Sequence, residues 1–200
     1  MSAAPEVAII DSGGANLASL QYALERLGAR SFVSSEPAAI AAAPRVLLPG
    51  VGAAGDAMRR LRSTGLDQLI PQLQAPLLGI CLGMQLLFEH STEGDTPCLG
   101  VLPGRIERLE AAPGRPVPHM GWNTLQACRE DPLLEGIART DRVYFVHSYA
   151  AALDERTLAA VSYGRPLAAA AGRGNFRGVQ FHPERSARVG ARVLRNFLAL

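Results

Sequence analysis

Lysine is absent from the 200-residue sequence, so all 20 basic residues are arginines. This excludes chemistry that needs a lysine side chain: a Schiff base, the usual anchor of pyridoxal phosphate, and the phosphate-binding lysine of a Walker motif. The net charge is only +2 and no run of arginines stands out. We therefore do not expect a nucleic acid as partner.

Cysteine is scarce as well, with Cys81, Cys98 and Cys128 the only three. The odd count and the lack of a C-x-x-C pair argue against a disulfide framework and the usual zinc site, and the four histidines suggest no metal site either. We expect no metal and no cofactor. Free cysteines fit a reducing cytoplasm. No signal-peptide pattern is seen, and no apolar run reaches the ~18 residues of a membrane span, so we expect no membrane association.

The first half of the chain alternates strand and helix patterns. Apolar runs predict strands at residues 7–10, 45–48 and 76–80, and helical spacing predicts helices at residues 17–27, 55–62, 66–73 and 82–90. This alternation predicts an α/β fold, a flavodoxin-like open and mostly parallel sheet with helices on both faces. Reactive groups in such sheets gather at the carboxyl ends of the strands.

The second half is richer in strands. Five shorter strands are expected at residues 101–110, 143–149, 158–163, 166–171 and 178–181, with a hairpin turn at residues 172–175. A last helix is expected to begin near Ser186 as N-cap and to bury Val189, Val193, Leu194, Phe197 and Leu198. Without a repeat or a long linker, residues 1–200 are expected to form one domain.

The most informative segment is residues 77–88, where Cys81 lies between an apolar strand and a helix. Gly79 and Gly83 flank Cys81 two residues away on each side, which is the spacing of a nucleophile elbow. A helix N-terminus stabilises a thiolate and directs the N–H of Leu82 at a developing oxyanion. Taken alone, the segment also fits a cysteine that is only a small buried apolar residue.

A matching base is His182, which follows an apolar strand that Pro183 ends. A thiol nucleophile needs a base, and the base needs an orienting group; Glu184, two residues beyond His182, fits that role beside Cys81. Alone, His182 could be a surface histidine paired with a glutamate. His147 is a rival base on another apolar strand, but it has no acid nearby, and we interpret it as a pocket or interface residue.

The sequence around these residues resembles the class I, triad-type glutamine amidotransferases, through residues 79–85 (GICLGMQ) and 181–184 (FHPE). Three further strings resemble one branch of that family, the glutaminase subunits of imidazole glycerol phosphate synthases. They are residues 49–52 (PGVG), 118–123 (PHMGWN) and 144–149 (YFVHSY). The likeness runs from residue 9 to the terminal helix, and residues 118–123 discriminate this branch from others.

The resemblance implies a glutaminase of histidine biosynthesis. In that chemistry Cys81 attacks the side-chain amide of glutamine, His182 moves the proton to the leaving ammonia, and Glu184 orients His182. The implied partner is the (β/α)8-barrel cyclase subunit of the synthase, in a heterodimer. There the ammonia reacts with a phosphoribulosyl-type nucleotide to give imidazole glycerol phosphate and an aminoimidazole carboxamide ribotide.

Two further groups of residues are implied by the resemblance. The oxyanion and substrate-binding group is Gly50, Val51, Gly52, Leu82, Gln85, Tyr144, His147 and Ser148. The partner-interface group is Asn16, Met120, Trp122, Asn123 and Arg185. In the family the strand at residues 49–52 can be unproductive until the synthase subunit binds its own ligand, and the two glycines make such a peptide flip cheap. An ordinary strand-to-helix turn is the alternative for this loop.

Two positions depart from the family pattern. Residues 11–16 read DSGGAN where DYGxGN is common, and Arg185 stands where lysine is common; arginine favours a bidentate pair with an acid on the cyclase. Three other functions stay open: a glutaminase for another synthase, a non-catalytic binding module on the same fold, and a cysteine peptidase.

Overall fold

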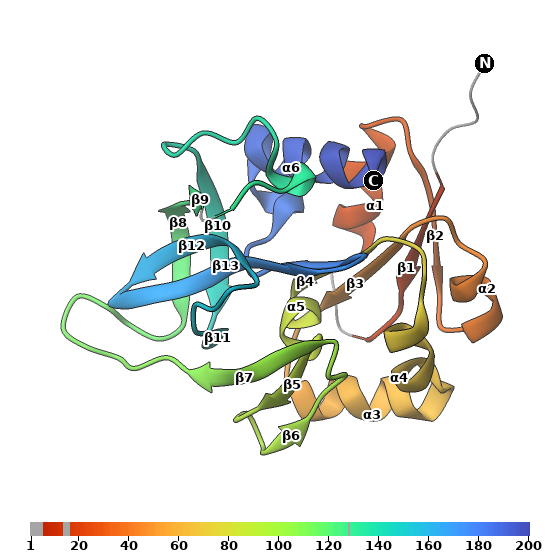
Figure 1. Cartoon of the computed structure of the whole chain (residues 1–200), viewed down its shortest axis with the longest axis horizontal. Coiled ribbons are helices and arrows are strands. Elements are labelled where there is room, and N and C mark those ends of the chain that lie inside the picture. Colours follow the sequence, from red (N-terminus) through yellow and green to blue (C-terminus); the bar gives the residue numbers. More distant parts are fainter. Residues whose placement is uncertain (1–5, 14–16, 128) are drawn as a thin grey trace.

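The computed structural model describes residues 6–13, 17–127 and 129–200, which fold around an eight-stranded sheet (Figure 1). The strand order is β2-β1-β3-β4-β14-β13-β12-β9. Strands β2 to β14 run parallel, and the last three pair antiparallel. The strands are β1 (Glu6–Ile10), β2 (Arg30–Ser34), β3 (Val46–Gly50), β4 (Leu77–Cys81), β9 (Gln126–Ala127), β12 (Thr157–Tyr163), β13 (Arg165–Arg173) and β14 (Phe176–Val179).

Helices cover both faces of this sheet (Figure 1). One face carries α1 (Leu17–Glu25) and α6 (Ala187–Ala199). The other face carries α2 (Pro37–Ala41), α3 (Ala54–Thr64), α4 (Leu66–Leu69) and α5 (Leu82–Leu86). Short 3-10 helices lie at Ile70–Gln72, Pro132–Leu134 and Pro183–Arg185. The predicted open, mostly parallel α/β sheet with helices on both faces is confirmed.

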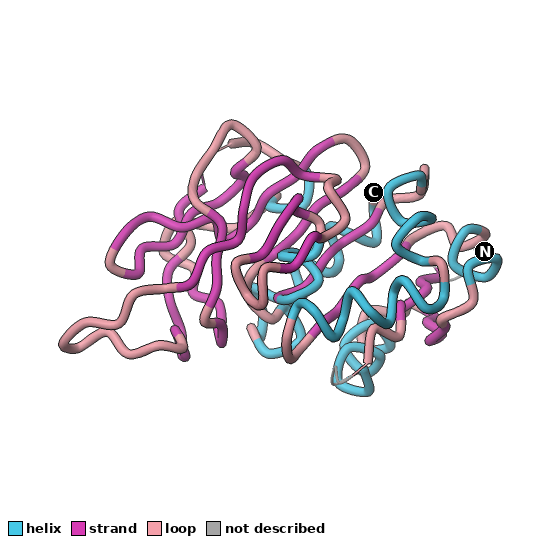
Figure 2. Tube along the Cα trace, turned by 90° about the horizontal axis from the view of Figure 1, so that it is seen from below, coloured by secondary structure: helices cyan, strands magenta, loops and turns pink. Residues whose placement is uncertain are grey.

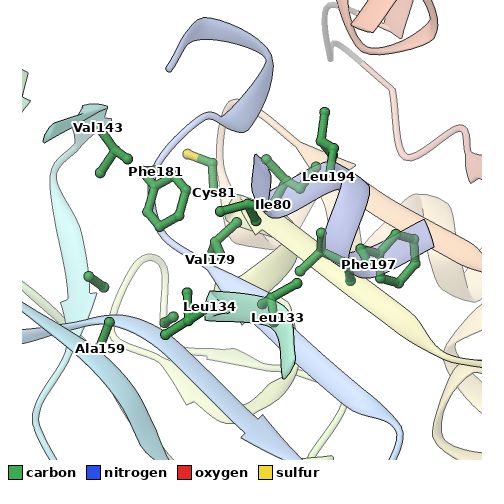
Figure 3. Packing of buried hydrophobic residues seen from close by; sticks show 14 of the residues in the cluster. Ile80, Cys81, Leu133, Leu134, Val143, Ala159, Val179, Phe181, Leu194 and Phe197 are labelled. Carbon is green, nitrogen blue, oxygen red and sulfur yellow. The ribbon is translucent and has the colours of Figure 1, made fainter. Parts of the chain in front are cut away.

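The core is divided by the sheet, because alternate side chains of a buried parallel strand point to opposite faces. In β1, Val7 and Ile9 pack on the side of α1 and α6, whereas Ala8 and Ile10 pack on the side of α3. Figure 3 shows the α6 side, where side chains of α6 meet those of β4 and of the segment around β14 directly beside Cys81. The nucleophile candidate thus ends a strand whose five residues are all buried.

The second half adds two small sheets, and strands crowd at one end of the molecule while helices lie at the other (Figure 2). The four-stranded sheet has the order β11-β7-β5-β6, and β8 pairs antiparallel with β10. These strands are β5 (Phe88–Ser91), β6 (Thr96–Pro97), β7 (Leu102–Arg108), β8 (His119–Thr124), β10 (Arg142–His147) and β11 (Tyr149–Ala151). The β-rich second half is confirmed, as is the hairpin between β13 and β14.

One expected helix is wrong in length. The helix at residues 82–90 stops at Leu86, and Phe88–Ser91 is strand β5, which pairs with β7. The N–H of Leu102 donates to the carbonyl of Leu87 at 2.8 Å, so pairing with a distant segment overrides the local helical spacing. The strand β2 and the helix α2 were not predicted, because β2 has no regular burial alternation and α2 has only five residues.

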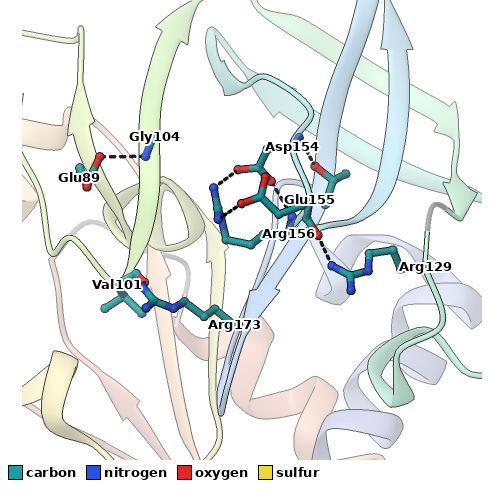
Figure 4. A network of polar contacts seen from close by, with 9 residues as sticks. Glu89, Val101, Gly104, Arg129, Asp154, Glu155, Arg156 and Arg173 are labelled. Carbon is teal, nitrogen blue, oxygen red and sulfur yellow. Dashed lines mark hydrogen bonds and ion pairs between the residues drawn. The ribbon is translucent and has the colours of Figure 1, made fainter.

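A polar network holds the turn between β11 and β12 (Figure 4). Arg156 forms an ion pair with Asp154 at 2.9 Å and a second one with Glu155. The carbonyl of Glu155 accepts a hydrogen bond from Arg129. Exposed pairs of this kind contribute little stability, so the network orders a surface turn.

Among the described residues, no helix combines the length and apolar character needed to cross a membrane.

Candidate active site

Cys81 ends the inner strand β4 in a strained turn, with φ 55° and ψ −112°. The turn is possible only because its neighbours are small. A Cβ on Gly83 would lie 1.7 Å from the carbonyl oxygen of Leu48, and one on Gly79 would lie 2.7 Å from the carbonyl oxygen of Gly83. The strand–turn–helix arrangement predicted from the glycine spacing is confirmed, and it lifts the sulfur above the end of the sheet.

His182 follows β14, the strand adjacent to β4, and its side chain meets Cys81. Its Nδ1 lies 2.8 Å from Oε1 of Glu184, and the two side chains are 9% and 10% exposed. The His182 Nε2 and Glu184 Oε2 atoms are buried and have no hydrogen-bond partner within the described part of the chain. A buried polar atom without a partner is costly, and here Nε2 is left available to exchange a proton with the thiol.

The charge state of His182 is set by its two partners. Burial lowers its pKa, but the interactions with Cys81 and Glu184 outweigh burial and raise the pKa to about 10. A histidine with a raised pKa is an imidazolium near pH 7. The imidazole of His182 therefore holds a proton beside the Cys81 side chain.

Ser186 fixes the backbone of the base. Its hydroxyl donates to the carbonyl of His182 at 2.7 Å and accepts from the N–H of Tyr144 at 2.9 Å. The N–H of His182 donates in turn to the carbonyl of Tyr144 at 2.9 Å. Ser186 does occupy the N-cap position of α6, but its side chain makes no capping bond, so the expected capping role is wrong. Its real partners lie on β10 and at His182, which sequence spacing does not reveal.

A cavity of about 550 Å³ opens over this triad. Its lining includes the triad and seven of the eight residues that the resemblance implied: Gly50, Val51, Gly52, Leu82, Gln85, His147 and Ser148. Tyr144 is not among the lining residues, although the resemblance placed it there. The volume of the cavity lies within the range that is typical of small-molecule sites.

Among the residues at the cavity that were not assigned to the site from the sequence are Glu93, Tyr149 and Gln180, which carry polar groups. Glu93 follows β5, lines the cavity, and accepts the N–H of Ala54 at 2.8 Å. Tyr149 lines it through the start of β11. Gln180 lies behind the cavity wall, where its Nε2 is 3.8 Å from Sγ of Cys81 and its Oε1 accepts from Gln85 at 3.0 Å.

The loop after β3 is held at both ends. The hydroxyl of Ser12 donates to the carbonyl of Pro49 at 2.6 Å, and Glu93 accepts from Ala54 beyond the loop. Between these anchors Val51 is 37% exposed, and Gly52 has a φ of +87° that suits glycine. The loop is thus anchored at both ends, and the conformational freedom that glycine gives its backbone is confined to the middle.

An exposed surface lies beside the cavity. Met120 and Trp122 on β8 are 67% and 45% exposed. The guanidinium of Arg185 sits 4.3 Å from the ring centre of Tyr144, and the Tyr144 and Trp122 rings are 6.1 Å apart. We call Met120, Trp122, Tyr144 and Arg185 the aromatic surface; Arg185 also lines the cavity.

Of the other residues expected at an interface, Asn123 is only partly exposed and donates to the carbonyl of Ser162 at 3.0 Å. Asn16 lies outside the described residues.

His147, the rival base, is engaged on both ring nitrogens. Its Nδ1 lies 2.9 Å from the carbonyl of Tyr149, and its Nε2 lies 3.0 Å from Nδ1 of His119. Burial lowers the pKa of His147 and of His119 to about 4 in each case. Both rings are therefore neutral near pH 7, and His147 has no free nitrogen to accept the Cys81 proton. Across the described residues, no cluster of three or more His, Cys, Asp or Glu side chains could hold a metal ion.

Known proteins resemble this chain in sequence and in fold. The family model for glutamine amidotransferase class-I matches residues 8–200. The imidazole glycerol phosphate synthase subunit HisH of Xylella fastidiosa strain Temecula1 is 54% identical over 195 residues, with 98% of each chain covered. The HisH subunit of Xanthomonas euvesicatoria pv. vesicatoria strain 85-10 is 55% identical over 195 residues, again with 98% of each chain covered.

Two solved structures support the fold alone. A crystal structure of a glutamine amidotransferase has a TM-score of 0.75 at 21% identity, covering 96% of this chain and 97% of its own. The structure of PurLQS from Thermotoga maritima has a TM-score of 0.72 at 20% identity, covering 98% of this chain and 98% of the matched chain.

Proposed function

This chain belongs to the class I glutamine amidotransferases, and on that premise we propose that Cys81, His182 and Glu184 are its catalytic residues. The function is that of the glutaminase subunit of imidazole glycerol phosphate synthase: hydrolysis of glutamine to glutamate and ammonia for histidine biosynthesis. The observation that carries the residue assignment is the meeting of three side chains, from two distant segments, at one cavity.

In the first half of the reaction, the Cys81 thiolate attacks the side-chain amide carbon of glutamine, and the carbonyl π electrons move to the oxygen. The N–H groups of Val51 and Leu82 stabilise the resulting oxyanion. His182 gives its Nε2 proton to the nitrogen, the carbon–nitrogen bond breaks, and ammonia leaves a thioester on Cys81.

In the second half, neutral His182 takes a proton from water, and the hydroxide attacks the thioester carbon. The carbon–sulfur bond breaks, glutamate leaves, and the sulfur returns as a thiolate beside the protonated imidazole. Glu184 stabilises that imidazolium through its 2.8 Å contact with Nδ1 and does not itself carry the proton.

The charged and polar side chains that line the cavity suit glutamine as the substrate. The Glu93 carboxylate is the acidic group of the lining beside the anchored loop, and it suits the α-ammonium group of glutamine. Gln85 is buried, and its Nε2 donates to the carbonyl of Tyr149 at 2.8 Å, so its amide is held in one orientation against the substrate side chain. A small amide fits this arrangement better than a peptide, which disfavours the peptidase alternative.

The chain is one subunit of a heteromeric synthase. We propose that its partner is a (β/α)8-barrel cyclase, in a heterodimer, which docks on the aromatic surface. The support is position: Arg185 belongs both to the exposed surface and to the cavity lining, so a partner seated there would meet the exit of the ammonia. Arginine and aromatic side chains are the types that interface centres favour. A cytoplasmic location stays a prediction.

We propose that the partner also controls the loop after β3. Because Ser12 and Glu93 anchor only its ends, rotation of the peptide before Val51 can bring the N–H into or out of the oxyanion position without moving the strand. Free hydrolysis of glutamine would then be low until the synthase is ready to use the ammonia.

Glutamine turnover tests this function directly. It is measured for the chain alone, with the cyclase, and with the cyclase and its nucleotide ligand. We expect turnover to be low alone and to rise in the complex, most of all when the ligand is present. A chain that is fully active alone contradicts the gating, and capture by a different synthase in place of the barrel cyclase contradicts the pathway.

A further inference from the structure

Two buried histidines link strand β8 to the reaction cavity. His119 on β8 and His147 on β10 are register partners, and they are 3% and 5% exposed. Nδ1 of His119 lies 3.0 Å from Nε2 of His147, whose Nδ1 lies 2.9 Å from the carbonyl of Tyr149. The triad described above uses neither ring.

The Tyr149 carbonyl fixes the direction of every bond in this link. A carbonyl oxygen only accepts, so His147 carries its proton on Nδ1, and its Nε2 is an acceptor. Nδ1 of His119 must then be the donor, and Nε2 of His119 must accept. That acceptor meets the Asn123 Nδ2 at 3.4 Å, which is a donor. Only one set of tautomers satisfies the whole link.

Asn123 is itself held in the matching orientation. Its Oδ1 accepts the N–H of Thr124 at 2.8 Å, and its Nδ2 donates to the carbonyl of Ser162 at 3.0 Å. The amide therefore cannot turn its oxygen toward His119 without losing both bonds. The link is closed at one end by this amide and at the other by the Tyr149 carbonyl.

The same carbonyl joins the link to the nucleophile. Nε2 of Gln85 donates to the Tyr149 carbonyl at 2.8 Å and to Oε1 of Gln180 at 3.0 Å, and Nε2 of Gln180 approaches Sγ of Cys81 at 3.8 Å. Gln85 and Gln180 are 4% and 1% exposed, so water does not replace these bonds. One continuous path of polar contacts thus runs from β8 to the sulfur, and the Tyr149 carbonyl accepts hydrogen bonds from both sides of it.

We propose that His119 is a positioning residue for glutamine hydrolysis, acting through His147 and the Tyr149 carbonyl on Gln85 and Gln180. This inference rests on the proposed glutaminase function. It also places the path behind the two exposed side chains of β8, since His119 precedes Met120 and Asn123 follows Trp122. If β8 shifts when a partner binds, this path of polar contacts would change the positions of the side chains at the cavity.

The alternative is that His119 only packs, since its ring stacks on Tyr163 with centroids 4.0 Å apart and on Phe145 at 4.8 Å. Two substitutions separate these roles, because a packing role and a positioning role predict opposite orders of glutaminase activity for them. His119→Phe keeps a flat ring for stacking and removes both nitrogens. His119→Asn loses the ring but keeps an amide donor near the Nδ1 position, facing His147.

Glutamine turnover is measured for both variants in the complex with the cyclase, together with ammonium-dependent synthesis by the same complex. We expect His119→Phe to lose roughly ten- to hundredfold in kcat/KM for glutamine, as small misplacements in active sites do, and His119→Asn to retain clearly more. Ammonium-dependent synthesis stays unchanged in both. The proposal is overturned if His119→Phe keeps the wild-type kcat/KM for glutamine while that of His119→Asn is reduced. A wild-type complex without glutaminase activity instead refutes the proposed function.

The tautomers give a readout that does not depend on activity. In the ¹⁵N-histidine-labelled chain, the nitrogen chemical shifts report which ring nitrogen of each neutral histidine carries the proton. His119 and His147 are assigned by their loss in His119→Phe and His147→Asn. We expect Nδ1–H on both rings at pH 7; Nε2–H on either ring, or a charged ring, overturns the proposal.

Discussion

Gly50 and Cys81 are direct register partners across the parallel strands β3 and β4. The loop that carries Val51 therefore leaves the sheet at the same edge, and next to the same residue, as the nucleophile. A Cβ on Gly50 would lie 3.0 Å from both the backbone nitrogen of Gly83 and the Cβ of Leu82, so this closeness depends on glycine. The two backbone N–H groups proposed for the oxyanion come from these two adjacent strand ends.

Ser12→Ala tests the anchor of that loop. Loss of the hydroxyl leaves the buried Pro49 carbonyl without its bond, which costs about 1 kcal/mol of unfolding free energy. We also expect kcat/KM for glutamine in the complex to fall about tenfold, less than the ~10²-fold loss of a whole oxyanion donor. Ser63→Ala is the control, because its hydroxyl makes an exposed bond within α3. Equal activity in both variants contradicts an anchoring role for Ser12.

Gly83→Ala and Gly55→Ala make the same chemical change at two different sites. A Cβ at residue 83 collides with the Leu48 carbonyl at 1.7 Å, whereas at residue 55 the closest atom is the side-chain oxygen of Thr96 at 3.4 Å. We expect Gly83→Ala to lose several kcal/mol or to fail to fold, and Gly55→Ala to be neutral or to gain up to about 1 kcal/mol from helix propensity. Denaturant unfolding measures both. Normal stability for Gly83→Ala would refute the close-packed elbow.

Glu184→Gln tests the charge on the base. Because Glu184 helps to raise the pKa of His182 to about 10, removing its charge lowers that pKa. As the pH rises, the variant then loses its protonated imidazole at a lower pH than the wild type does. The alkaline limb of the kcat/KM profile should therefore shift toward neutrality. The exposed Glu107→Gln serves as control. An alkaline limb that stays in place in Glu184→Gln means that the carboxylate does not set the proton on His182.

Stability should fall in mild acid because of His119 and His147. Their pKa values are lowered to about 4 in the folded chain, below 6.5, so between these pH values the unfolded chain binds more protons. The free energy of unfolding therefore falls as pH drops from 6.5 to 4. His182 has the opposite shift: its stabilising contribution is complete below pH 6.5 and is lost as pH rises toward 10.

Urea unfolding at several pH values measures this effect. We expect His119→Phe to have a shallower loss of stability between pH 6.5 and 4 than the wild type, because one depressed histidine is gone. The exposed carboxylates are common to both proteins and cancel in the comparison. The same slope for both proteins would show that His119 does not stay neutral in the folded chain.

The elbow and the triad could be predicted because their signals are local. The glycine spacing around Cys81 indicates a nucleophile turn, and the short His182–Glu184 interval indicates a base with its orienting group. The fold then places these two segments at adjacent strands. Ser186 and Glu93 could not be predicted, since each acts on a backbone group far away in sequence: Tyr144 for Ser186, and Ala54 for Glu93.

Dependence on distant parts of the chain also explains what the sequence predicted wrongly. Phe88–Ser91 forms a strand only because β7 pairs with it, and nothing within residues 82–90 indicates that partner. The resemblance placed Tyr144 at the substrate together with His147 and Ser148, and only the latter two line the cavity. The Tyr144 ring instead lies 4.3 Å from the guanidinium of Arg185.

The most direct test of the account is to replace the sulfur and supply ammonia from outside. The complex of Cys81→Ala with the cyclase is assayed with glutamine and, separately, with ammonium salt. We expect glutamine-dependent synthesis to be abolished while ammonium-dependent synthesis continues at the wild-type rate, with Cys98→Ala normal in both assays. If Cys81→Ala still turns over glutamine, Cys81 is not the nucleophile and the proposed mechanism is wrong.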